Sequence, residues 1–402
     1  MICADPKQER AEENVESTLK RTWAEVDLDA LAHNYELIRR HVGGNTKLLG
    51  VIKADAYGHG AVPVAKELEA LGASYLAVSN IDECEEVRLA GVTLPVLMLG
   101  YTPADQAERI LELDMTQAVQ SLSIARAFSD AAVRLGKKMK VHVKLDTGMG
   151  RLGFSCDEAH FDASLRDILE LVHLPGLDAE GIFTHFCVAD EDGEENVEFT
   201  HEQHALFARM IDEVEKRSGF RFRLRHCCNA GGIVRYPEWA GDMVRCGILL
   251  YGSGELAEEM GMEPVMALKS RVATVREFAP GTSVSYGRTY VTARESRIAV
   301  LPIGYADGLH RALSNKIEVL TPYGRAKQVG RICMDMCMID VTDLPQVKSG
   351  DEIEIFGKHV RCARDAQLCD TIPYELLCAV SKRVPRHYFL HGARVDTDLK
   401  AL

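Results

Sequence analysis

The sequence predicts an α/β fold in which a (β/α)8 TIM barrel is followed by a C-terminal, mainly antiparallel β domain. Short apolar runs alternate with amphipathic helical stretches roughly every 30 residues, as in repeated strand–helix units. Eight such runs are apolar on both faces, and eight buried parallel strands close a barrel. After Gly254 the helical spacing nearly disappears, and short alternating strands separated by turn residues follow. An open doubly wound sheet is the alternative that the pattern leaves open.

A flexible arm is expected over residues 1–21, because this segment is polar and charged and has little to bury. A strand is expected over residues 22–28, and its membership of the barrel or of the C-terminal β domain stays open. A helix follows, because its apolar residues fall on one face: Leu31, Tyr35 and Ile38.

The barrel is expected over residues 22–255. Its eight strands are the apolar runs 47–53, 75–80, 95–100, 116–120, 140–146, 178–186, 222–230 and 242–252. Several of the intervening helices end at a glycine, as helices often do. The clearest of these helices are 62–72, 81–91, 123–136 and 199–219.

The C-terminal β domain is expected over residues 256–402. The dipeptides PG, YG and SG separate segments of strand length, which is typical of an antiparallel sheet. The expected strands lie within 268–279, 296–308, 317–344 and 351–360, and a short helix is expected near 373–384.

The charge of the chain limits the partners that it can bind. Its 47 lysine and arginine residues and 60 aspartate and glutamate residues give a formal net charge of −13. Nucleic acids and anionic membranes both require a basic face, so neither is expected as the main partner. No apolar run approaches the roughly 18 residues of a membrane span, and the first residues lack the apolar segment of a signal peptide. The expected location is the cytoplasm.

The twelve cysteines include no C-x-x-C pair, and many lie inside apolar runs. Free thiols in a reducing compartment are therefore expected rather than disulfides. His226, Cys227 and Cys228 are adjacent, but no spacing supports zinc, so we assign them to the core and expect no metal.

Polar residues at the carboxyl ends of barrel strands are the candidates for chemistry. Lys53 is either a lysine that reaches the surface or a desolvated amine that forms Schiff bases with carbonyl compounds. Arg245 interrupts an apolar strand, so its guanidinium needs an ion-pair partner or a ligand. Two loops of small residues, 229–232 and 247–248, would suit a phosphate. The other candidates at strand ends are Lys144, Arg151, His185 and Asn229.

The motifs around these residues resemble those of alanine racemases over nearly the whole chain, from about Trp23 to Arg386. The ten-residue motif around Lys53, VIKADAYGHG, is highly specific. The other matching motifs are Arg151 in DTGMGRLG, His185 in FTHF, Arg245 in MVRCGI, Tyr286 in VSYGRTY, IGYADG at 303–308, Met334 and Asp335 in GRICMD, and Tyr374 in PYELLC.

The resemblance implies an enzyme that uses pyridoxal 5′-phosphate (PLP) to interconvert L- and D-alanine and so supplies D-alanine for peptidoglycan. Lys53 would carry the cofactor, and Arg245 would face its pyridine nitrogen and keep it unprotonated. His185 would tie Arg245 towards the catalytic tyrosine. The remaining cofactor-binding residues would be Tyr57, Asn229, Ala230, Gly247, Ile248 and Tyr374. The family usually has serine where this chain has Ala230, so only the backbone of Ala230 could contact the phosphate.

Racemisation removes an α-proton from one face and returns one to the other, so it requires two acid–base groups. The resemblance implies Lys53 for D-alanine and Tyr286 for L-alanine, with Tyr286 supplied by the second subunit of a homodimer. Arg151 and the backbone N–H of Met334 would bind the substrate carboxylate. The supporting residues would be Lys144, which some members carbamylate, Tyr305 at the inner gate of the substrate channel, and Asp335.

Three alternatives remain at the level of the sequence. A serine or broad-specificity racemase is the nearest, although Tyr374 fills a position where a smaller polar residue would enlarge the pocket. A PLP-dependent decarboxylase of similar plan would not need two opposed bases. A PLP carrier would resemble the barrel alone, without the domain that bears Tyr286.

Overall fold

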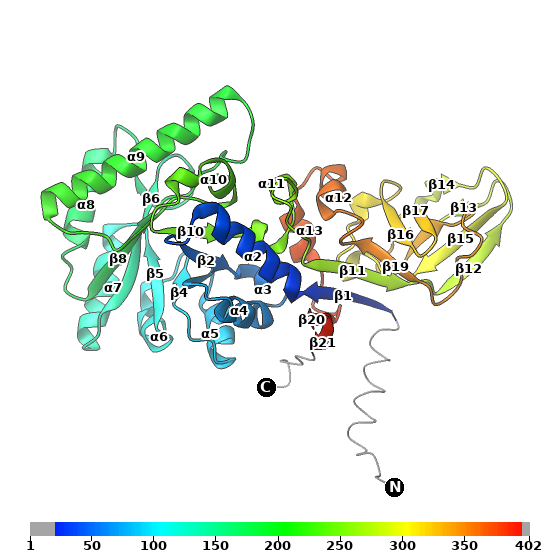
Figure 1. Cartoon of the computed structure of the whole chain (residues 1–402), viewed down its shortest axis with the longest axis horizontal. Helices are drawn as coiled ribbons and strands as arrows, with labels where there is room; N and C mark the ends of the chain where they lie inside the picture. The colour runs from blue at the N-terminus through cyan, green and yellow to red at the C-terminus, as the bar shows by residue number, and fades with distance from the viewer. Residues whose placement is uncertain (1–20, 396–402) are drawn as a thin grey trace, which may run out of the picture.

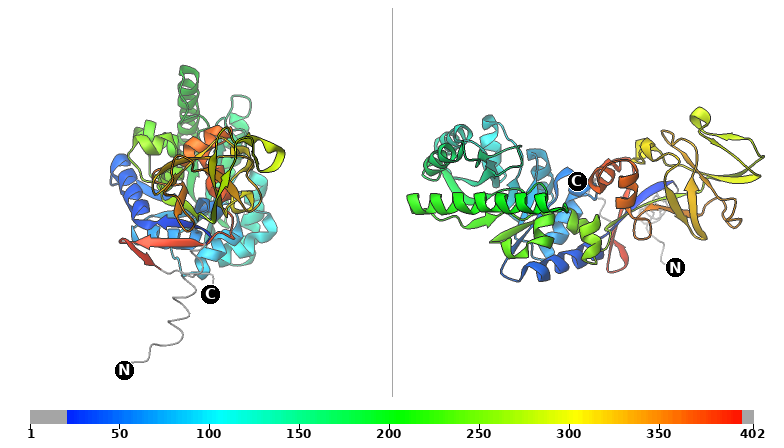
Figure 2. Two further views of the ribbon diagram at one scale, coloured as in Figure 1. Left: turned by 90° about the vertical axis from the view of Figure 1, so that its right-hand side faces the viewer. Right: turned by 90° about the horizontal axis from the view of Figure 1, so that it is seen from above.

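The computed structural model of the chain describes residues 21–395, which form two large sheets at opposite ends of an elongated molecule (Figures 1 and 2). The expected arm lies outside the described residues apart from Arg21. Short helices from the C-terminal part of the chain lie between the two sheets (Figure 1).

The first sheet is the predicted barrel. Its strands are all parallel and follow the ring order β10-β2-β3-β4-β5-β6-β8-β9. Two backbone hydrogen bonds of 3.1 Å connect β9 to β10, from Asp242 N to Arg225 O and from Arg245 N to Cys228 O. The barrel is therefore confirmed over the open sheet. The strands are β2 (Lys47–Val51), β3 (Tyr75–Val78), β4 (Val96–Met98), β5 (Met115–Val119), β6 (Met139–Asp146), β8 (Leu177–Phe183), β9 (Leu224–His226) and β10 (Met243–Cys246), with the short β7 (Phe154–Ser155) beside β6.

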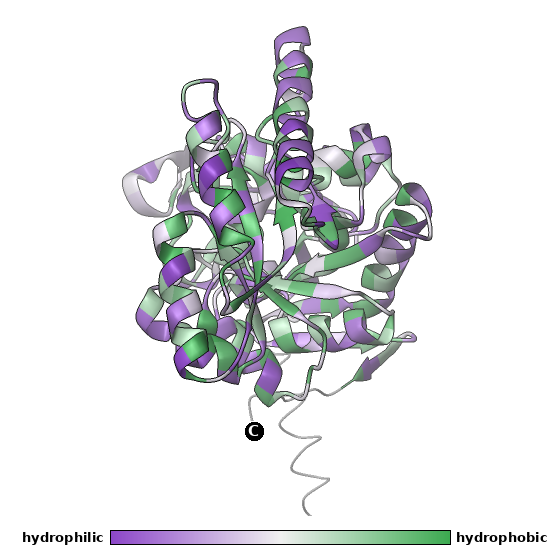
Figure 3. Cartoon of the chain, turned by 90° about the vertical axis from the view of Figure 1, so that its left-hand side faces the viewer, coloured by the Kyte–Doolittle hydropathy of each residue, from purple (hydrophilic) through white to green (hydrophobic). Residues whose placement is uncertain are grey.

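Helices surround the barrel, with their apolar sides on the strands and their polar sides outward (Figure 3). The helix expected after the first strand is α2 (Leu28–Val42), capped by the Asp27 side chain and buried at Leu31, Tyr35 and Ile38. Similar side-chain caps begin three more barrel helices, at Asn80, Ser121 and Asn229. The remaining helices of the barrel are α4 (Ala61–Ala70), α5 (Ile81–Leu89), α6 (Ala107–Glu112), α7 (Leu122–Arg134), α8 (Phe161–Leu171), α9 (Glu194–Ser218) and α10 (Ala230–Arg235).

Several expected strands end earlier than predicted, because turns at the barrel mouth take over their last residues. β2 ends at Val51, and Lys53 begins the short helix α3 (Lys53–Tyr57). β10 ends at Cys246, and the apolar run continues as a 3-10 turn over Ile248–Tyr251. An apolar run alone does not distinguish a strand from a buried turn.

The second sheet has ten strands in the order β12-β15-β18-β17-β16-β19-β11-β1-β20-β21. Its pairs are antiparallel except β1 with β20, so the first strand of the chain lies inside the C-terminal sheet. The strands are β1 (Thr22–Asp27), β11 (Met266–Arg271), β12 (Thr274–Phe278), β15 (Ser296–Leu301), β16 (Glu318–Thr321), β17 (Gly324–Gln328), β18 (Cys337–Asp340), β19 (Glu352–Phe356), β20 (Arg386–Leu390) and β21 (Ala393–Val395), with a separate hairpin of β13 (Ser283–Val284) and β14 (Tyr290–Val291).

The helices α11 (Glu255–Glu259), α12 (Cys362–Leu368) and α13 (Pro373–Ala379) lie between the two sheets (Figure 1). α13 packs on the turn that carries Lys53: a Cβ atom built on Gly58 would lie 2.4 Å from the carbonyl oxygen of Leu377. Arg386 Nε also donates to Gly58 O at 3.1 Å. The C-terminal part of the chain thus fixes one wall of the barrel mouth.

All cysteines within residues 21–395 are free thiols, as expected, while Cys3 lies outside the described residues. His226, Cys227 and Cys228 are almost fully buried, which confirms their assignment to the core. Among the described helices, none combines the length and the apolar character that crossing a bilayer demands.

Candidate active site

A cavity of about 330 Å³ opens at the carboxyl ends of the barrel strands. A volume of this order suits a small-molecule ligand. Every candidate that the sequence placed in the barrel lines this cavity, together with Tyr374 from α13: Lys53, Tyr57, Lys144, Arg151, His185, Asn229, Ala230, Arg245, Gly247 and Ile248.

Lys53 stands at the start of a left-handed turn. Ala54, Asp55, Ala56 and Tyr57 all have φ between +53° and +55°, a conformation that costs L-residues energy and that clusters at functional sites. The carboxylate of Glu83 holds the turn in place, because it accepts from Ala54 N and from Ser79 N at 2.8 Å each. Neither Glu83 nor Ser79 stands out in the sequence.

The Lys53 amine is half-buried, and burial together with the nearby positive charge of Arg151 lowers its pKa. A lowered pKa increases the fraction of unprotonated amine near neutral pH. This is the form that attacks a carbonyl group or accepts a proton.

Two tyrosines and two short stretches of chain, at residues 229–230 and 247–248, line the cavity. The rings of Tyr57 and Tyr374 are 5.6 Å apart, and burial raises the pKa of Tyr374 to about 12 and that of Tyr57 further, so both hydroxyls remain neutral donors. A Cβ atom on Gly247 would lie 3.2 Å from Tyr57 Oη, so the glycine lets backbone and hydroxyl approach. Asn229 caps α10 through Gly232 N at 3.2 Å.

Arg245 is 4% exposed and is held by backbone carbonyl groups. Its Nη2 donates to Thr184 O at 2.8 Å and Cys227 O at 3.0 Å, and its Nη1 donates to His226 O at 3.1 Å. The direct ion pair that the sequence left open is not formed with any residue in the described part of the chain. Burial lowers the pKa of Arg245 to about 10. This value is still well above neutral pH, so the guanidinium remains cationic.

His185 lines the cavity beside Arg245, with its Nδ1 3.3 Å from Arg245 Nη2. Burial and the surrounding cations, Arg245 first, lower the pKa of His185 far below its usual value. Its imidazole is therefore neutral, and Nδ1 accepts from the guanidinium because arginine can only donate.

Lys144 and Arg151 also line the cavity. Lys144 is 7% exposed, its Nζ donates to Leu145 O at 2.5 Å, and burial together with Arg245 lowers its pKa to about 7. The loop to Arg151 is held by Asp146, which accepts from Gly148 N and Gly150 N at 3.0 Å each. Arg151 itself is exposed at the cavity mouth.

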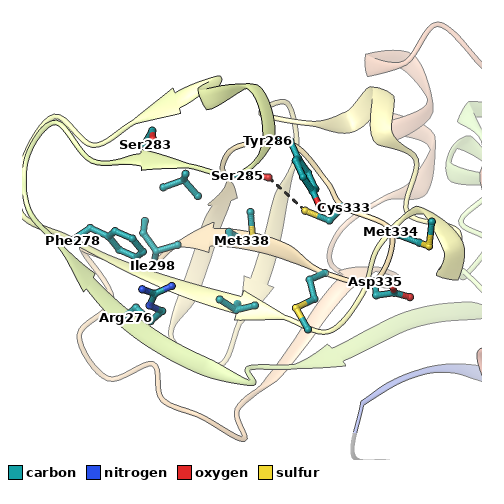
Figure 4. A pocket seen from close by; sticks show the side chains of 13 residues that line it. Arg276, Phe278, Ser283, Ser285, Tyr286, Ile298, Cys333, Met334, Asp335 and Met338 are labelled. Atoms are coloured by element: carbon teal, nitrogen blue, oxygen red, sulfur yellow. Dashed lines mark hydrogen bonds between the residues drawn. The ribbon is translucent and has the colours of Figure 1, made fainter.

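The remaining candidates lie in the C-terminal sheet, around a second cavity of about 610 Å³ (Figure 4). Tyr286, Met334 and Asp335 line it, and the Tyr286 side chain is 69% exposed. Ser285, with φ of 68°, precedes the tyrosine and donates from Oγ to Arg331 O at 2.6 Å. In this single chain the two sets of candidates therefore line separate cavities.

Tyr305 adjoins the Met334 loop, because Tyr305 N donates to Cys333 O at 3.0 Å. Asp307 accepts from Gly304 N at 2.9 Å and from Arg383 Nε at 2.8 Å, and Arg383 also contacts Asp335 at 2.7 Å. Asp307 is buried and had been visible only as one letter of IGYADG. Within residues 21–395, no group of three or more histidine, cysteine, aspartate or glutamate side chains is arranged to hold a metal ion.

Comparison with known proteins gives a single answer. The model of the alanine racemase N-terminal domain matches residues 26–255, and that of the C-terminal domain matches residues 265–388. The chain is similar to alanine racemase 2 of Caldanaerobacter subterraneus subsp. tengcongensis, with 44% identity over 94% of this chain and 97% of that protein. It is 47% identical to the alanine racemase of Desulfovibrio desulfuricans over 91% and 97% of the two chains.

Solved structures agree with these relatives. The alanine racemase of Clostridium difficile 630 matches with a TM-score of 0.86 and 40% identity over 93% of this chain and 97% of the other. The enzyme of the D-cycloserine producer Streptomyces lavendulae matches with a TM-score of 0.86 and 32% identity over 92% and 97%.

Proposed function

The chain belongs to the alanine racemase family and is an isomerase that interconverts L- and D-alanine, and we propose that it does so with PLP held in the barrel cavity. The observation that carries the proposal is the gathering of the barrel candidates around one cavity that contains a lysine of lowered pKa. A desolvated amine is what Schiff-base chemistry requires. We also propose a domain boundary near residue 255, a cytoplasmic location and a role in supplying D-alanine for peptidoglycan.

The donors around the cavity fit this cofactor. Lys53 would bind its aldehyde carbon, and Arg245 would donate towards its ring nitrogen, which a permanently cationic guanidinium keeps unprotonated. The phosphate would meet the hydroxyls of Tyr57 and Tyr374 and the backbone of Ala230, Gly247 and Ile248. When bound, the cofactor withdraws electrons from the substrate α-carbon and so makes its proton acidic.

Two residues of the protein would then move the proton. The Lys53 amine would serve the face from which D-alanine loses its α-proton, and the Tyr286 phenol would serve the face of L-alanine. Arg151 would bind the substrate carboxylate with the backbone N–H of Met334, which fixes the α-carbon between the two bases. Lys144, Tyr305 and Asp335 would support these groups.

We propose that Tyr286 of the partner subunit completes the site in a homodimer. Tyr286 is 69% exposed, and Met334 and Met336 beside it are 53% and 49% exposed, an unusual concentration of large apolar surface. Because these residues are absent from the lining of the Lys53 cavity, a second copy of the chain has to bring them there.

Subunit mixing tests this arrangement. Lys53→Ala and Tyr286→Phe homodimers should each be inactive, whereas a hybrid dimer carries both substitutions in one site and none in the other. Random exchange should then restore about a quarter of the wild-type activity. Hybrid dimers that form, as measured by native mass spectrometry, and stay inactive would contradict the shared site.

Incubation of the purified protein with L-alanine or L-serine, followed by chiral analysis of the products, tests the substrate. Racemised alanine with little racemised serine is expected. The cofactor is tested by absorbance: borohydride should remove the band of the bound cofactor, because it reduces the C=N bond to Lys53, and Lys53→Ala should lack this band. Retention of the same band in Lys53→Ala would contradict the cofactor assignment.

A further inference from the structure

A series of polar side chains crosses the barrel interior from its amino-terminal end to the cavity, joined by hydrogen-bond distances except between Glu180 and His142. Glu180 Oε2 accepts from Tyr75 Oη at 2.6 Å and lies 3.7 Å from His142 Nε2. His142 Nδ1 is 2.9 Å from His226 Nε2, and His226 Nδ1 is 3.1 Å from Arg245 Nη1. Both histidines are completely buried.

The hydrogen-bond direction along this series is fixed by the arginine. A guanidinium only donates, so His226 Nδ1 must accept from Arg245. A neutral His226 then carries its proton on Nε2 and donates it to His142 Nδ1. His142 in turn carries its proton on Nε2, which faces the Glu180 carboxylate. Each imidazole therefore has one possible tautomer.

The barrel is built around these side chains. The register of β6 and β8 shifts between Val141 and His142, so that Glu180 has no direct partner in β6, as at a β-bulge that re-aims a side chain. A Cβ atom on the next residue, Gly181, would lie 2.7 Å from His142 Nε2, so only glycine leaves room for the ring. The Phe183 ring stacks on His226 at 4.8 Å with an interplanar angle of 2°.

The series connects the buried cation Arg245 with a carboxylate that it does not touch. Arg223 lies 3.8 Å from Glu180 Oε1, and the hydrogen bonds and charges around Glu180 lower its pKa to about 2. Burial lowers the pKa of both histidines, which keeps them neutral. The charged and titratable groups that face the series from the surrounding strands are Tyr75, Lys144, Glu180, His185, Arg223 and Arg245.

We propose that Glu180, His142 and His226 are positioning residues of the racemase, which orient the Arg245 guanidinium into the cavity and balance its charge from the opposite end of the barrel. The proposal rests on the proposed function in so far as Arg245 faces the cofactor there. Two polarised neutral imidazoles take the place of a direct ion pair between Arg245 and a carboxylate. A direct ion pair would put that carboxylate next to an anionic ligand, which it would repel.

The wild-type enzyme provides the first test, without any substitution. Nitrogen-15 correlation spectra of the imidazole groups, recorded on the full-length protein with and without PLP, report tautomer and charge. Both His142 and His226 should be neutral with the proton on Nε2 between about pH 5 and pH 9. A proton on Nδ1 of either ring, or titration of either ring in that range, would overturn the proposal.

The second test uses a matched pair of carboxylates at the same end of the barrel. Asp178 contacts Arg223 at 2.8 Å, as Glu180 does at 3.8 Å, but does not take part in the series. Glu180→Gln should shift the His226 imidazole resonances and lower kcat about tenfold. It should also shift the acidic side of the curve of kcat against pH. Asp178→Asn should change none of these. Equal effects of the two substitutions would overturn the proposal.

Tyr75→Phe is a second variant for the case that Glu180→Gln does not fold. It removes one hydrogen bond to Glu180 and keeps the carboxylate. It should move the His226 resonances in the same direction and by less; unchanged resonances would count against the proposal. The imidazole spectra do not depend on turnover, so a protein without racemase activity would refute the proposed function and still leave the series testable.

Discussion

The two cavities differ in how completely the chain builds them. In the barrel, Arg245 is 4% exposed and held by three carbonyl groups, and Lys144 is 7% exposed. In the C-terminal sheet, Tyr286 and Met334 are more than half exposed on short loops. The barrel half is thus formed by packing within one chain, whereas the other half presents its groups outward. A catalytic group on the second half can be lost without loss of fold, which separates effects on activity from effects on stability.

The largest effect on activity is expected for Lys53→Ala, in the barrel cavity. We expect kcat to fall by at least about 10⁴-fold, because one group both binds the cofactor and transfers the proton. Lys66→Ala, at an exposed lysine of α4, should leave activity unchanged. Racemisation assays measure both, and residual activity within tenfold of wild type in Lys53→Ala would contradict the assignment.

Tyr286→Phe tests the exposed half. Proton abstraction from L-alanine should slow by about 10²- to 10⁴-fold. The measurement is the primary deuterium isotope effect in each direction, with exposed Tyr323→Phe as the control. Equal isotope effects in both directions, unchanged from wild type, would reject Tyr286 as the second base.

Arg245→Met tests the buried half through stability. Three buried carbonyl oxygens and His226 Nδ1 would lose their donor, so the free energy of unfolding should fall by about 3 kcal/mol. Arg325, exposed and bonded to the carbonyl of His359, provides the control Arg325→Met, expected within about 0.5 kcal/mol of wild type. Urea unfolding of both variants as apoproteins measures the difference, and equal losses would contradict it.

Lys144 sharpens the comparison through pH. Its pKa is about 7 in the folded protein and lies at the usual, higher value in the unfolded chain, so between these values the unfolded chain binds the proton and the folded protein does not. Stability should therefore rise with pH across this range, by at most about 1.4 kcal/mol per pH unit. Lys144→Met should lack this increment, whereas exposed Lys137→Met should retain it; an unchanged slope in Lys144→Met would contradict the lowered pKa.

The same amine is the candidate for carbamylation. The unprotonated amine attacks the carbon of CO₂, forms an N–C bond as one C=O π bond opens onto oxygen, and releases one proton, which turns a neutral amine near Arg151 and Arg245 into an anion. Carbon-13 bicarbonate should therefore give a carbamate signal that Lys144→Met lacks. A signal that persists in the variant would assign the carbamate to another residue.

The smallest expected effect concerns the left-handed turn. Ala54 is exposed with φ of 53°, so Ala54→Gly should stabilise the protein by up to about 1 kcal/mol. The same change at Ala32, inside the right-handed helix α2, should destabilise it by about 1 kcal/mol. Thermal unfolding compares the two, and the same sign at both positions would contradict the strain at Ala54.

The barrel could be predicted because its strands and helices differ in the period of their apolar residues, and that period depends on local sequence. Lys53 and Arg245 stood out because burying a charged side chain inside an apolar run costs free energy unless an ion-pair partner or a ligand compensates for it. The left-handed turn after Lys53 could not be predicted, since Ala54 and Ala56 are residues that favour right-handed helix. The contacts of Glu83 and α13 impose it.

Glu180 was missed for a related reason. Its inward direction depends on a register shift between β6 and β8, and register is decided by the pairing of distant segments. The contact between His226 and Arg245 was missed as well. His226 is part of the buried core, and a sequence pattern that indicates burial does not show which polar group the buried ring contacts.

The position of β1 has a consequence for the order in which the chain can fold during synthesis. Thr22 pairs with Ser270 and Ala24 pairs with Arg386, so β1 is synthesised long before β11 and β20, its neighbours in the sheet. Such long-range pairing slows folding and exposes an unpaired strand meanwhile. It also means that the C-terminal sheet is not a block that can be cut off or exchanged, since one of its central strands comes from the other end of the polypeptide.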